Sequence, residues 1–167
     1  IDMRKFLTFL AIVVLATVAG ALYGAVNDQL TYTISPEYYT RFKFVQFGLD
    51  GSVHLMVSPR YVVAGVGVLA PWWMGLFIGA ILGAVGFVHR TAGAMFRATM
   101  GAMGVTAAVA FALALAGLLY GKIHLARTGV DWWLPEGLVN QANFIAVGSM
   151  HNFSYAGAPI GLLAGNG

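Results

Sequence analysis

The chain has 167 residues, of which 59% are hydrophobic and only 9% are charged, and its mean hydropathy is +0.79. Globular domains are about 45–50% apolar, and a soluble domain of this size could not bury so much apolar surface. The net charge of +3 is too small and too scattered to suggest nucleic-acid binding. Because the chain has no cysteine, disulfides, thiolate metal sites and iron–sulfur clusters are excluded. The composition predicts an integral membrane protein.

Four apolar segments are each long enough to cross a bilayer, which takes about 20 helical residues. They are residues 6–26, 61–88, 92–120 and 137–163, and the polar loops between them include 27–60 and 121–136. We therefore expect an all-α integral membrane protein with four transmembrane helices, forming a single membrane domain over residues 1–167.

The first segment begins with Arg4 and Lys5 and continues from Phe6 to Val26. A basic start followed by an apolar stretch and small residues is also typical of a signal peptide. Because the apolar run continues past the small residues to Val26, we expect a retained transmembrane helix.

Residues 27–60 form the largest polar loop, and their aromatic content is too high for a disordered segment. Leu30–Ile34 is β-branched and aromatic, and Arg41–Phe44 alternates, which are patterns typical of short strands. Asp50-Gly51 suits a tight turn before Ser52–Val57. The sequence thus predicts a structured, partly β outer loop between the first and second helices.

Glycines at four-residue spacing occur in the first three segments, and this spacing places them on one helix face, where they favour close packing against another helix. The predicted helix-packing residues are Gly20, Gly24, Gly75, Gly79, Gly83, Gly117 and Gly121. Two of these pairs lie in similar stretches, Ala19–Gly24 and Ala116–Gly121, a likeness that fits either an internal duplication or chance. Pro71 predicts a kink in the second helix.

The fourth segment is too polar to face lipid on every side. At about 100° per residue, four of its polar side chains fall on one helix face: Asn140, Asn143, His151 and Ser154. A polar stripe inside a bilayer must face partner helices or a wet cavity, because lipid leaves its hydrogen bonds unmet. With the neighbouring Asn152, these residues are the candidates for a cofactor- or ligand-binding site.

His151 is the strongest single candidate. A histidine within the membrane can ligate the metal of a haem or chlorin pigment, or relay a proton. Its neighbours Ser149 and Asn152 would equally satisfy a neutral imidazole in a helix-packing network. A single histidine makes no metal cage, so we expect no metal site and no cofactor other than that haem or chlorin alternative.

The sequence has no GxSxG, HExxH or phosphate-binding glycine loop, and we expect no catalytic residues. All six acidic residues are expected outside the membrane core. This argues against proton- or cation-coupled transport, which usually needs an acidic residue within the membrane.

The distribution of charge predicts an orientation. Basic residues Arg4 and Lys5 precede the first helix, and Arg90 and Arg97 lie near the short connection between the second and third helices. By the positive-inside rule, both termini and this connection are expected in the cytoplasm and the two longer loops outside. The expected location is the bacterial inner membrane.

Four motifs occur in order along the chain: Tyr23-Gly24-x-x-x-Asp28-Gln29, Pro36-Glu37-Tyr38-Tyr39-Thr40, Trp72-Trp73 and His151-Asn152-x-Ser154-Tyr155. In these motifs the chain resembles an uncharacterised family of bacterial multi-pass membrane proteins. The resemblance implies four helices with a structured first outer loop, and it implies no particular activity.

These patterns favour a non-catalytic membrane subunit that packs with other membrane subunits and lipids in a larger assembly, such as a respiratory or photosynthetic energy-transducing complex. The alternative is a small oligomeric transporter or channel for a neutral solute, with a pathway lined by the polar stripe. A homo-oligomer is compatible with both hypotheses.

Overall fold

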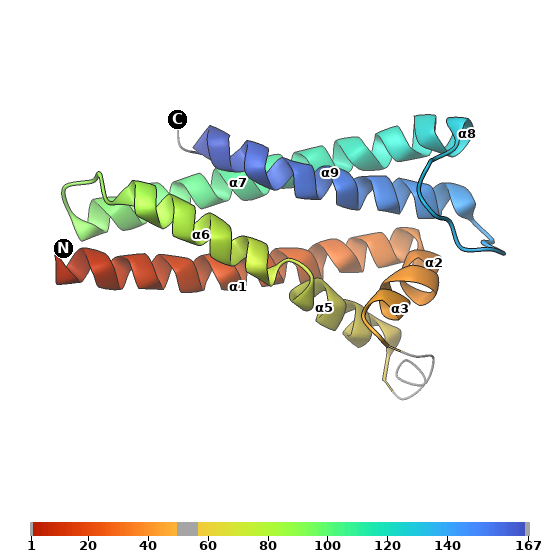
Figure 1. The fold of residues 1–167 in the computed structure, drawn as a ribbon, viewed down its shortest axis with the longest axis horizontal. Coiled ribbons are helices and arrows are strands. Elements are labelled where there is room, and N and C mark those ends of the chain that lie inside the picture. The colour runs from red at the N-terminus through yellow and green to blue at the C-terminus, as the bar shows by residue number, and fades with distance from the viewer. Residues whose placement is uncertain (1, 50–56, 166–167) are drawn as a thin grey trace.

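The computed structural model describes residues 2–49 and 57–165, which fold into helices joined by short connections (Figure 1). Three helical stretches are long and apolar enough to cross a membrane: Met3–Ile34, Pro59–Gly86 and Ala92–Thr128. The predicted all-α membrane class is confirmed in the described residues. The fourth predicted span is not among the three, because its helix is more polar.

The elements follow one another in a simple order. They are α1 (Met3–Ile34), α2 (Pro36–Tyr38), the π-helix η1 (Tyr39–Lys43), α3 (Phe44–Gln46), α5 (Pro59–Leu69), α6 (Trp72–Gly86), α7 (Ala92–Tyr120), the π-helix η2 (Gly121–Leu125), α8 (Ala126–Thr128) and α9 (Gln141–Gly165). Short polar side chains cap two of the long helices, because Asp2 accepts a hydrogen bond from the Arg4 N–H and Thr91 accepts one from the Ala94 N–H.

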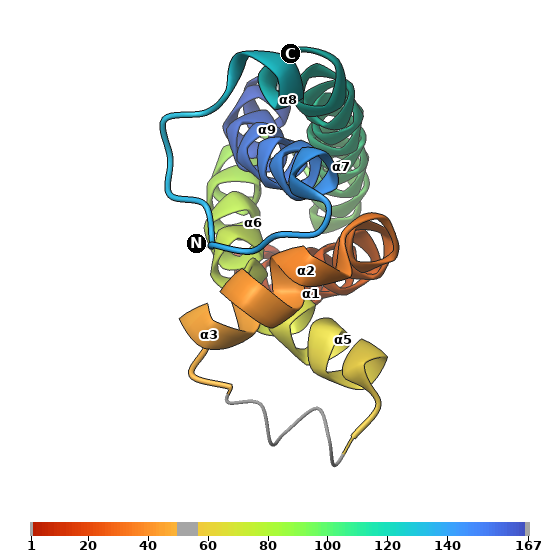
Figure 2. The same cartoon turned by 90° about the vertical axis from the view of Figure 1, so that its right-hand side faces the viewer.

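The long helices form two pairs (Figures 1 and 2). In one pair α1 packs against α5 and α6, and in the other α7 packs against α9. The chain termini and the turn between α6 and α7 lie at the same end of the bundle. The Lys5 ammonium joins the first helix to that turn by donating a hydrogen bond of 2.5 Å to the His89 carbonyl. The short helices α2, η1 and α3 form a cap at the other end.

Five of the predicted packing glycines lie between α1 and the α5–α6 helices: Gly20, Gly24, Gly75, Gly79 and Gly83. A Cβ added to Gly79 would lie 2.5 Å from the Ala16 Cβ, and one added to Gly20 would lie 3.0 Å from the Gly75 Cα. Contacts this close require glycine, so the backbones of α1 and α6 touch directly.

Glycines also form the contact between α7 and α9. A Cβ on Gly117 would lie 2.5 Å from the Phe153 Cβ, and one on Gly121 would lie 2.8 Å from the Ala146 Cα. A further triplet at four-residue spacing, which the sequence interpretation missed, packs its backbone against α7: Gly157, Gly161 and Gly165.

The prediction of β structure in the first outer loop is wrong for the described residues. Leu30–Ile34 continues α1, and Arg41–Phe44 belongs to η1 and α3. Burial overrides the local β propensity, because Asp28 and Thr31 lie on the inner face of the extended helix. The third predicted strand, Ser52–Val57, lies almost wholly outside the described residues.

The boundaries of the predicted helices differ most at the cap end. The first helix continues to Ile34 instead of ending at Val26, and helix continues beyond Tyr120 to Thr128 in the predicted loop 121–136. The kink predicted at Pro71 is confirmed as a break between α5 and α6.

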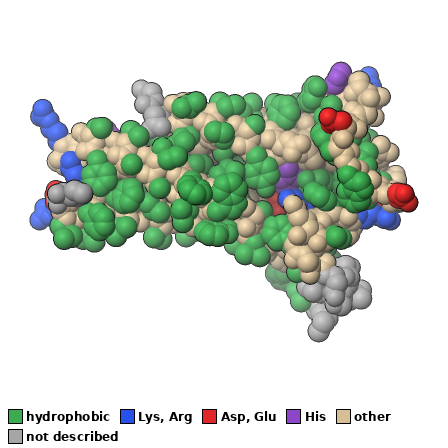
Figure 3. Space-filling model, in the orientation of Figure 1, with side chains coloured by type: hydrophobic (Ala, Val, Ile, Leu, Met, Phe, Trp, Pro, Cys, Tyr) green, Lys and Arg blue, Asp and Glu red, His purple; other side chains and the backbone are tan. Residues whose placement is uncertain are grey.

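Apolar side chains cover most of the bundle, and charged side chains gather mainly at its two ends, with a small group of acidic, basic and histidine atoms visible between them (Figure 3). The end that carries the N-terminus is mainly basic, whereas the cap end shows basic, acidic and histidine side chains together. An apolar belt between two polar ends is the surface expected of a helical membrane protein.

Candidate functional site

A cluster of buried polar side chains lies at the cap end, where α1, η1 and α9 meet. Its ionisable members are Asp28 of α1, Lys43 of η1 and His151 of α9, which are 4%, 6% and 5% exposed. Charged and titratable groups are rarely so buried unless they are paired. The cluster is therefore the candidate functional site.

Asp28 and His151 face each other across the two helix pairs, with 3.9 Å between the Asp28 Oδ1 and the His151 Nε2. The ring of Tyr38 stacks on the imidazole at a centroid distance of 5.2 Å and an interplanar angle of 8°. Asp28 is buried inside the protein, because α1 continues through this residue and turns it inward.

Tyr39 is fully buried next to Asp28. Its hydroxyl lies 2.5 Å from the Thr31 hydroxyl, and Thr31 in turn donates to the Asn27 carbonyl at 3.0 Å. Burial raises the pKa of Tyr39, and the neighbouring Asp28 raises it further. Burial likewise raises the pKa of Tyr38. Both phenols therefore remain protonated and serve as neutral hydrogen-bonding groups.

Lys43 brings the third ionisable group to the cluster. Burial lowers the pKa of Lys43, and the negative charge of Asp28 opposes that effect. Its ammonium also lies 5.9 Å and 6.0 Å from the ring centroids of Phe42 and Phe47. The cap thus contributes a cation that compensates the buried carboxyl of α1.

Several buried atoms around this cluster have no hydrogen-bond partner among the described residues: Asn27 Oδ1, Asp28 Oδ2, Ser35 Oγ, Ser149 Oγ and His151 Nε2. Most buried polar atoms in proteins are hydrogen-bonded, to protein or to ordered water. These atoms are therefore suited to contact water or a bound polar group.

The polar stripe predicted on the fourth helix is divided among separate contacts. The Asn140 side chain accepts from the Asn143 N–H at 3.0 Å and caps α9. Asn143 donates to the Ile34 carbonyl at 3.0 Å and accepts from the Lys122 ammonium. The Ser154 hydroxyl lies 2.9 Å from the Tyr23 hydroxyl. These residues join helices to one another and do not line a single path with His151.

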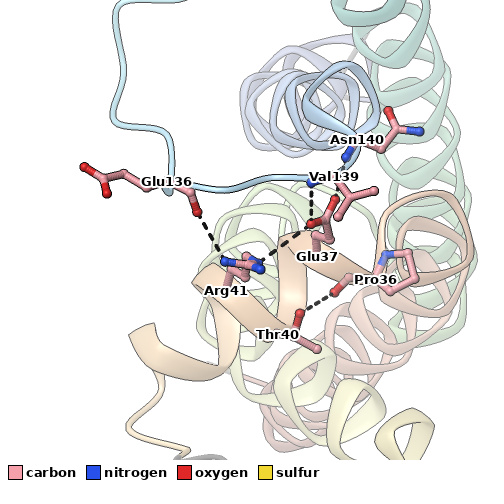
Figure 4. A network of polar contacts seen from close by, with 7 residues as sticks. All are labelled: Pro36, Glu37, Thr40, Arg41, Glu136, Val139 and Asn140. Atoms are coloured by element: carbon pink, nitrogen blue, oxygen red, sulfur yellow. Dashed lines mark hydrogen bonds and ion pairs between the residues drawn. The ribbon is translucent and has the colours of Figure 1, made fainter.

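Polar contacts hold the segment that precedes α9 against the cap (Figure 4). The Glu37 carboxylate accepts from the Val139 and Asn140 N–H groups at 2.9 Å and 2.8 Å. Arg41 lies 3.7 Å from Glu37 and donates to the Glu136 carbonyl at 3.2 Å. The hydrogen bonds from Val139 and Asn140 lower the pKa of Glu37. The sequence carried no pattern that would have paired these distant residues.

A cavity of about 110 Å³ lies between the two helix pairs, on the side of the polar cluster that faces away from the cap. Small and apolar side chains of α1, α6, α7 and α9 line most of it, and Tyr23, Ser154 and Tyr155 form its polar end. The contact between the pairs is therefore looser than the glycine contacts within each pair.

The His151 Nε2, the atom considered as a ligand of a haem or chlorin, lies 3.9 Å from the Asp28 Oδ1, and Tyr38 covers one face of the ring. In the ranges 2–49 and 57–165, no three His, Asp or Glu side chains come together as a metal-binding group.

No protein-family model, no curated protein and no solved structure matches the chain. Inference about function therefore rests on the geometry of this molecule.

Proposed function

We propose that this protein is a non-catalytic multi-pass membrane subunit that joins other membrane proteins through an uncovered face of α7. In this proposal α9 crosses the membrane as a fourth helix, and both termini lie in the cytoplasm of a bacterial cell. The buried polar cluster then serves to fasten the outer cap to the transmembrane helices.

The position of α9 supports a fourth span. This helix runs beside α7 toward the end that carries both termini (Figure 1). Its 25 residues extend about 37 Å at 1.5 Å per residue, which exceeds the hydrocarbon thickness of a bilayer. Its residues from Phe144 to His151 are buried, so the polar side chains among them are shielded from lipid by the rest of the molecule.

The observation that carries the proposal is a stripe of small residues on the outer face of α7. A Cβ added to Gly101 or Gly104 would meet nothing within 4 Å, and Ala108 and Ala112 continue the exposed stripe. In lipid, helices associate by close backbone packing at small residues, because there is little hydrophobic force between them. The predicted packing glycines are all used inside the chain, whereas this stripe is free for a neighbouring helix.

Cross-linking from single cysteines tests this proposal in a chain that has no cysteine of its own. A cysteine at Ala108 is expected to cross-link to a neighbouring protein in native membranes, whereas one at Val18, on the outer face of α1, is expected to give none. Gly104→Leu should abolish the adduct, because a branched side chain separates the helices. Mass analysis of the adduct distinguishes a different subunit from a second copy of this chain.

Two results would contradict the proposal. One is a protein that remains monomeric after gentle extraction and gives no adduct at residue 108. The other is an adduct with a second copy alone, which would make the protein a homo-oligomer without foreign subunits.

A further inference from the structure

A recess lined with aromatic residues lies on the cap side of the molecule, outside the polar cluster. It has a volume of about 260 Å³ and is bounded by the cap, by α9 and by the segment that precedes α9. Its lining, which we call the aromatic recess, consists of Tyr38, Phe42, Trp132, Trp133 and Phe144, with Gly148 and Asn152.

One wall of the aromatic recess is a packed group of three rings. Tyr38 lies 5.1 Å from Phe144 and 5.3 Å from Phe42, and Phe42 lies 6.5 Å from Phe144, measured between ring centroids. On its other side, Tyr38 stacks on His151. Contacts on several sides fix the position of Tyr38, so this wall is preformed.

The opposite wall comes from the two tryptophans. Gly148 lies between the walls, because a Cβ added there would be 3.5 Å from the Tyr38 Cε2 and 3.7 Å from the Trp132 Cζ2. A larger side chain at this position would occupy the recess. Trp133 stands at the rim with 68% of its surface exposed, so its ring is accessible to a ligand.

The chemistry of this lining selects for one kind of ligand. The faces of aromatic rings attract cations, and rings of Trp and Tyr do so best. A quaternary ammonium group carries positive charge without any N–H, so it needs no hydrogen-bond acceptor. A primary ammonium has three donors to satisfy, and Asn152 is the only side-chain amide in the lining. We propose that the aromatic recess binds a quaternary ammonium group.

The charges of the segment that carries the two tryptophans also favour a cation. The segment from Gly129 to Asn140 contains Asp131 and Glu136 and has no Lys or Arg. The nearest cap cation that contacts this segment, Arg41, is engaged with Glu37 and with the Glu136 carbonyl. On the opposite wall the Lys43 ammonium already lies 5.9 Å from the Phe42 ring centroid, so a cation is expected to bind on the side that the tryptophans occupy.

The ligand has two natural sources, a choline-type lipid headgroup and a small solute in the outer medium. The test uses the full-length protein in nanodiscs of phosphatidylethanolamine, which has no quaternary ammonium. Tryptophan fluorescence is titrated with choline and with its neutral isostere, in which carbon replaces the nitrogen. Choline should give a saturable change, and the isostere should bind at least about fivefold more weakly.

Three variants and one control distinguish binding in the aromatic recess from binding near other tryptophans. Trp133→Ala should weaken choline binding by roughly 5- to 30-fold, and Trp133→Phe should weaken it less. Gly148→Val should abolish binding by filling the recess. Trp73→Ala, on the distant helix α6, is the matched control and should bind choline like the parent. Because Trp133 is exposed, its replacement leaves the fold intact, and circular dichroism verifies this.

Nanodiscs of phosphatidylcholine distinguish the two sources. If the lipid headgroup is the ligand, choline titration in these discs should give a much smaller response, because the recess is already occupied. If a free solute is the ligand, the response should be the same in both lipids. The proposal is overturned by equal binding of choline and its isostere, by no saturable response in phosphatidylethanolamine, or by unchanged binding in Trp133→Ala. The aromatic residues would then act only as interfacial anchors.

Discussion

Gly75 lies in the closest part of the contact between α1 and α6, and replacing it with alanine tests whether backbone contact stabilises this pair. The added Cβ would meet the Ala16 carbonyl oxygen and would lie 3.1 Å from both the Ala16 C and the Thr17 Cα. These are backbone atoms, so no side chain can rotate away. The two helices must separate instead, by roughly 0.5–1 Å, which forfeits a quarter to a half of the dispersion energy of each neighbouring contact.

The expected cost follows from that separation. Overpacking costs about 1–3 kcal/mol, and the weakened contacts along the glycine seam bring the total for Gly75→Ala to about 2–4 kcal/mol. Gly65→Ala on α5 is the matched control, because its Cβ meets nothing within 4 Å. There the higher helix propensity of alanine stabilises by at most about 1 kcal/mol. The two variants should differ by about 3 kcal/mol, roughly a hundredfold in the unfolding equilibrium.

Unfolding in mixed detergent micelles, followed by tryptophan fluorescence, measures this difference, since Trp72 and Trp73 begin α6. Equal midpoints for Gly75→Ala and Gly65→Ala would refute the reasoning. They would mean that the helices accommodate a methyl group at the seam, and that the glycine spacing does not specify the contact.

Three further predictions concern the cap and its attachment. Hydrogen bonds from Val139 and Asn140 hold the pKa of Glu37 below the usual 4.5. The ionised carboxylate therefore stabilises the folded protein above about pH 4.5, and this stabilisation is lost as the pH falls through the lowered pKa. The protection of the Val139 and Asn140 amides from hydrogen exchange, relative to the intrinsic rate at each pH, should therefore fall in that acidic range, and Glu37→Ala should lack this protection already at pH 7; protection independent of Glu37 would contradict this. His151→Phe keeps a ring that can stack on Tyr38 and removes only the imidazole nitrogen 3.9 Å from Asp28, so it should destabilise by at most about 1 kcal/mol, and His151→Leu, which also loses the ring contact, should cost more; thermal melts that put the two variants in the opposite order would rule this out. For the membrane orientation, an impermeant thiol reagent should label a cysteine at Thr40 in intact cells and one at Thr91 only after permeabilisation; the reverse pattern would invert the topology.

The helix contacts were more accessible to sequence reasoning than the polar site. Gly75, Gly79 and Gly83 occur at a spacing that places them on one helix face, and the predicted start of the third segment at Ala92 agrees with the start of α7. The same rule applied to the fourth segment would have found Gly157 and Gly161. The fourth segment was interpreted from its polar side chains alone, so these glycines were missed.

The polar site could not be predicted because it depends on where α1 ends. Leu30–Ile34 has the local composition of a strand, and only its burial against the cap makes it helical. That extension turns Asp28 inward, toward a histidine 123 residues later in the chain. No local pattern encodes such a pairing, nor the hydrogen bonds that Val139 and Asn140 donate to Glu37.

The division into two helix pairs has a consequence for the order of biogenesis. Each pair consists of consecutive long helices, so α1 can join α5 and α6 before α7 and α9 have been synthesised, as domains fold from the N-terminus during translation. His151 arrives with the last helix to emerge. Until then Asp28 has its neighbours from the cap, Tyr39 and Lys43, but lacks the cover of α9. Completion of the chain is thus coupled to the full burial of that carboxyl.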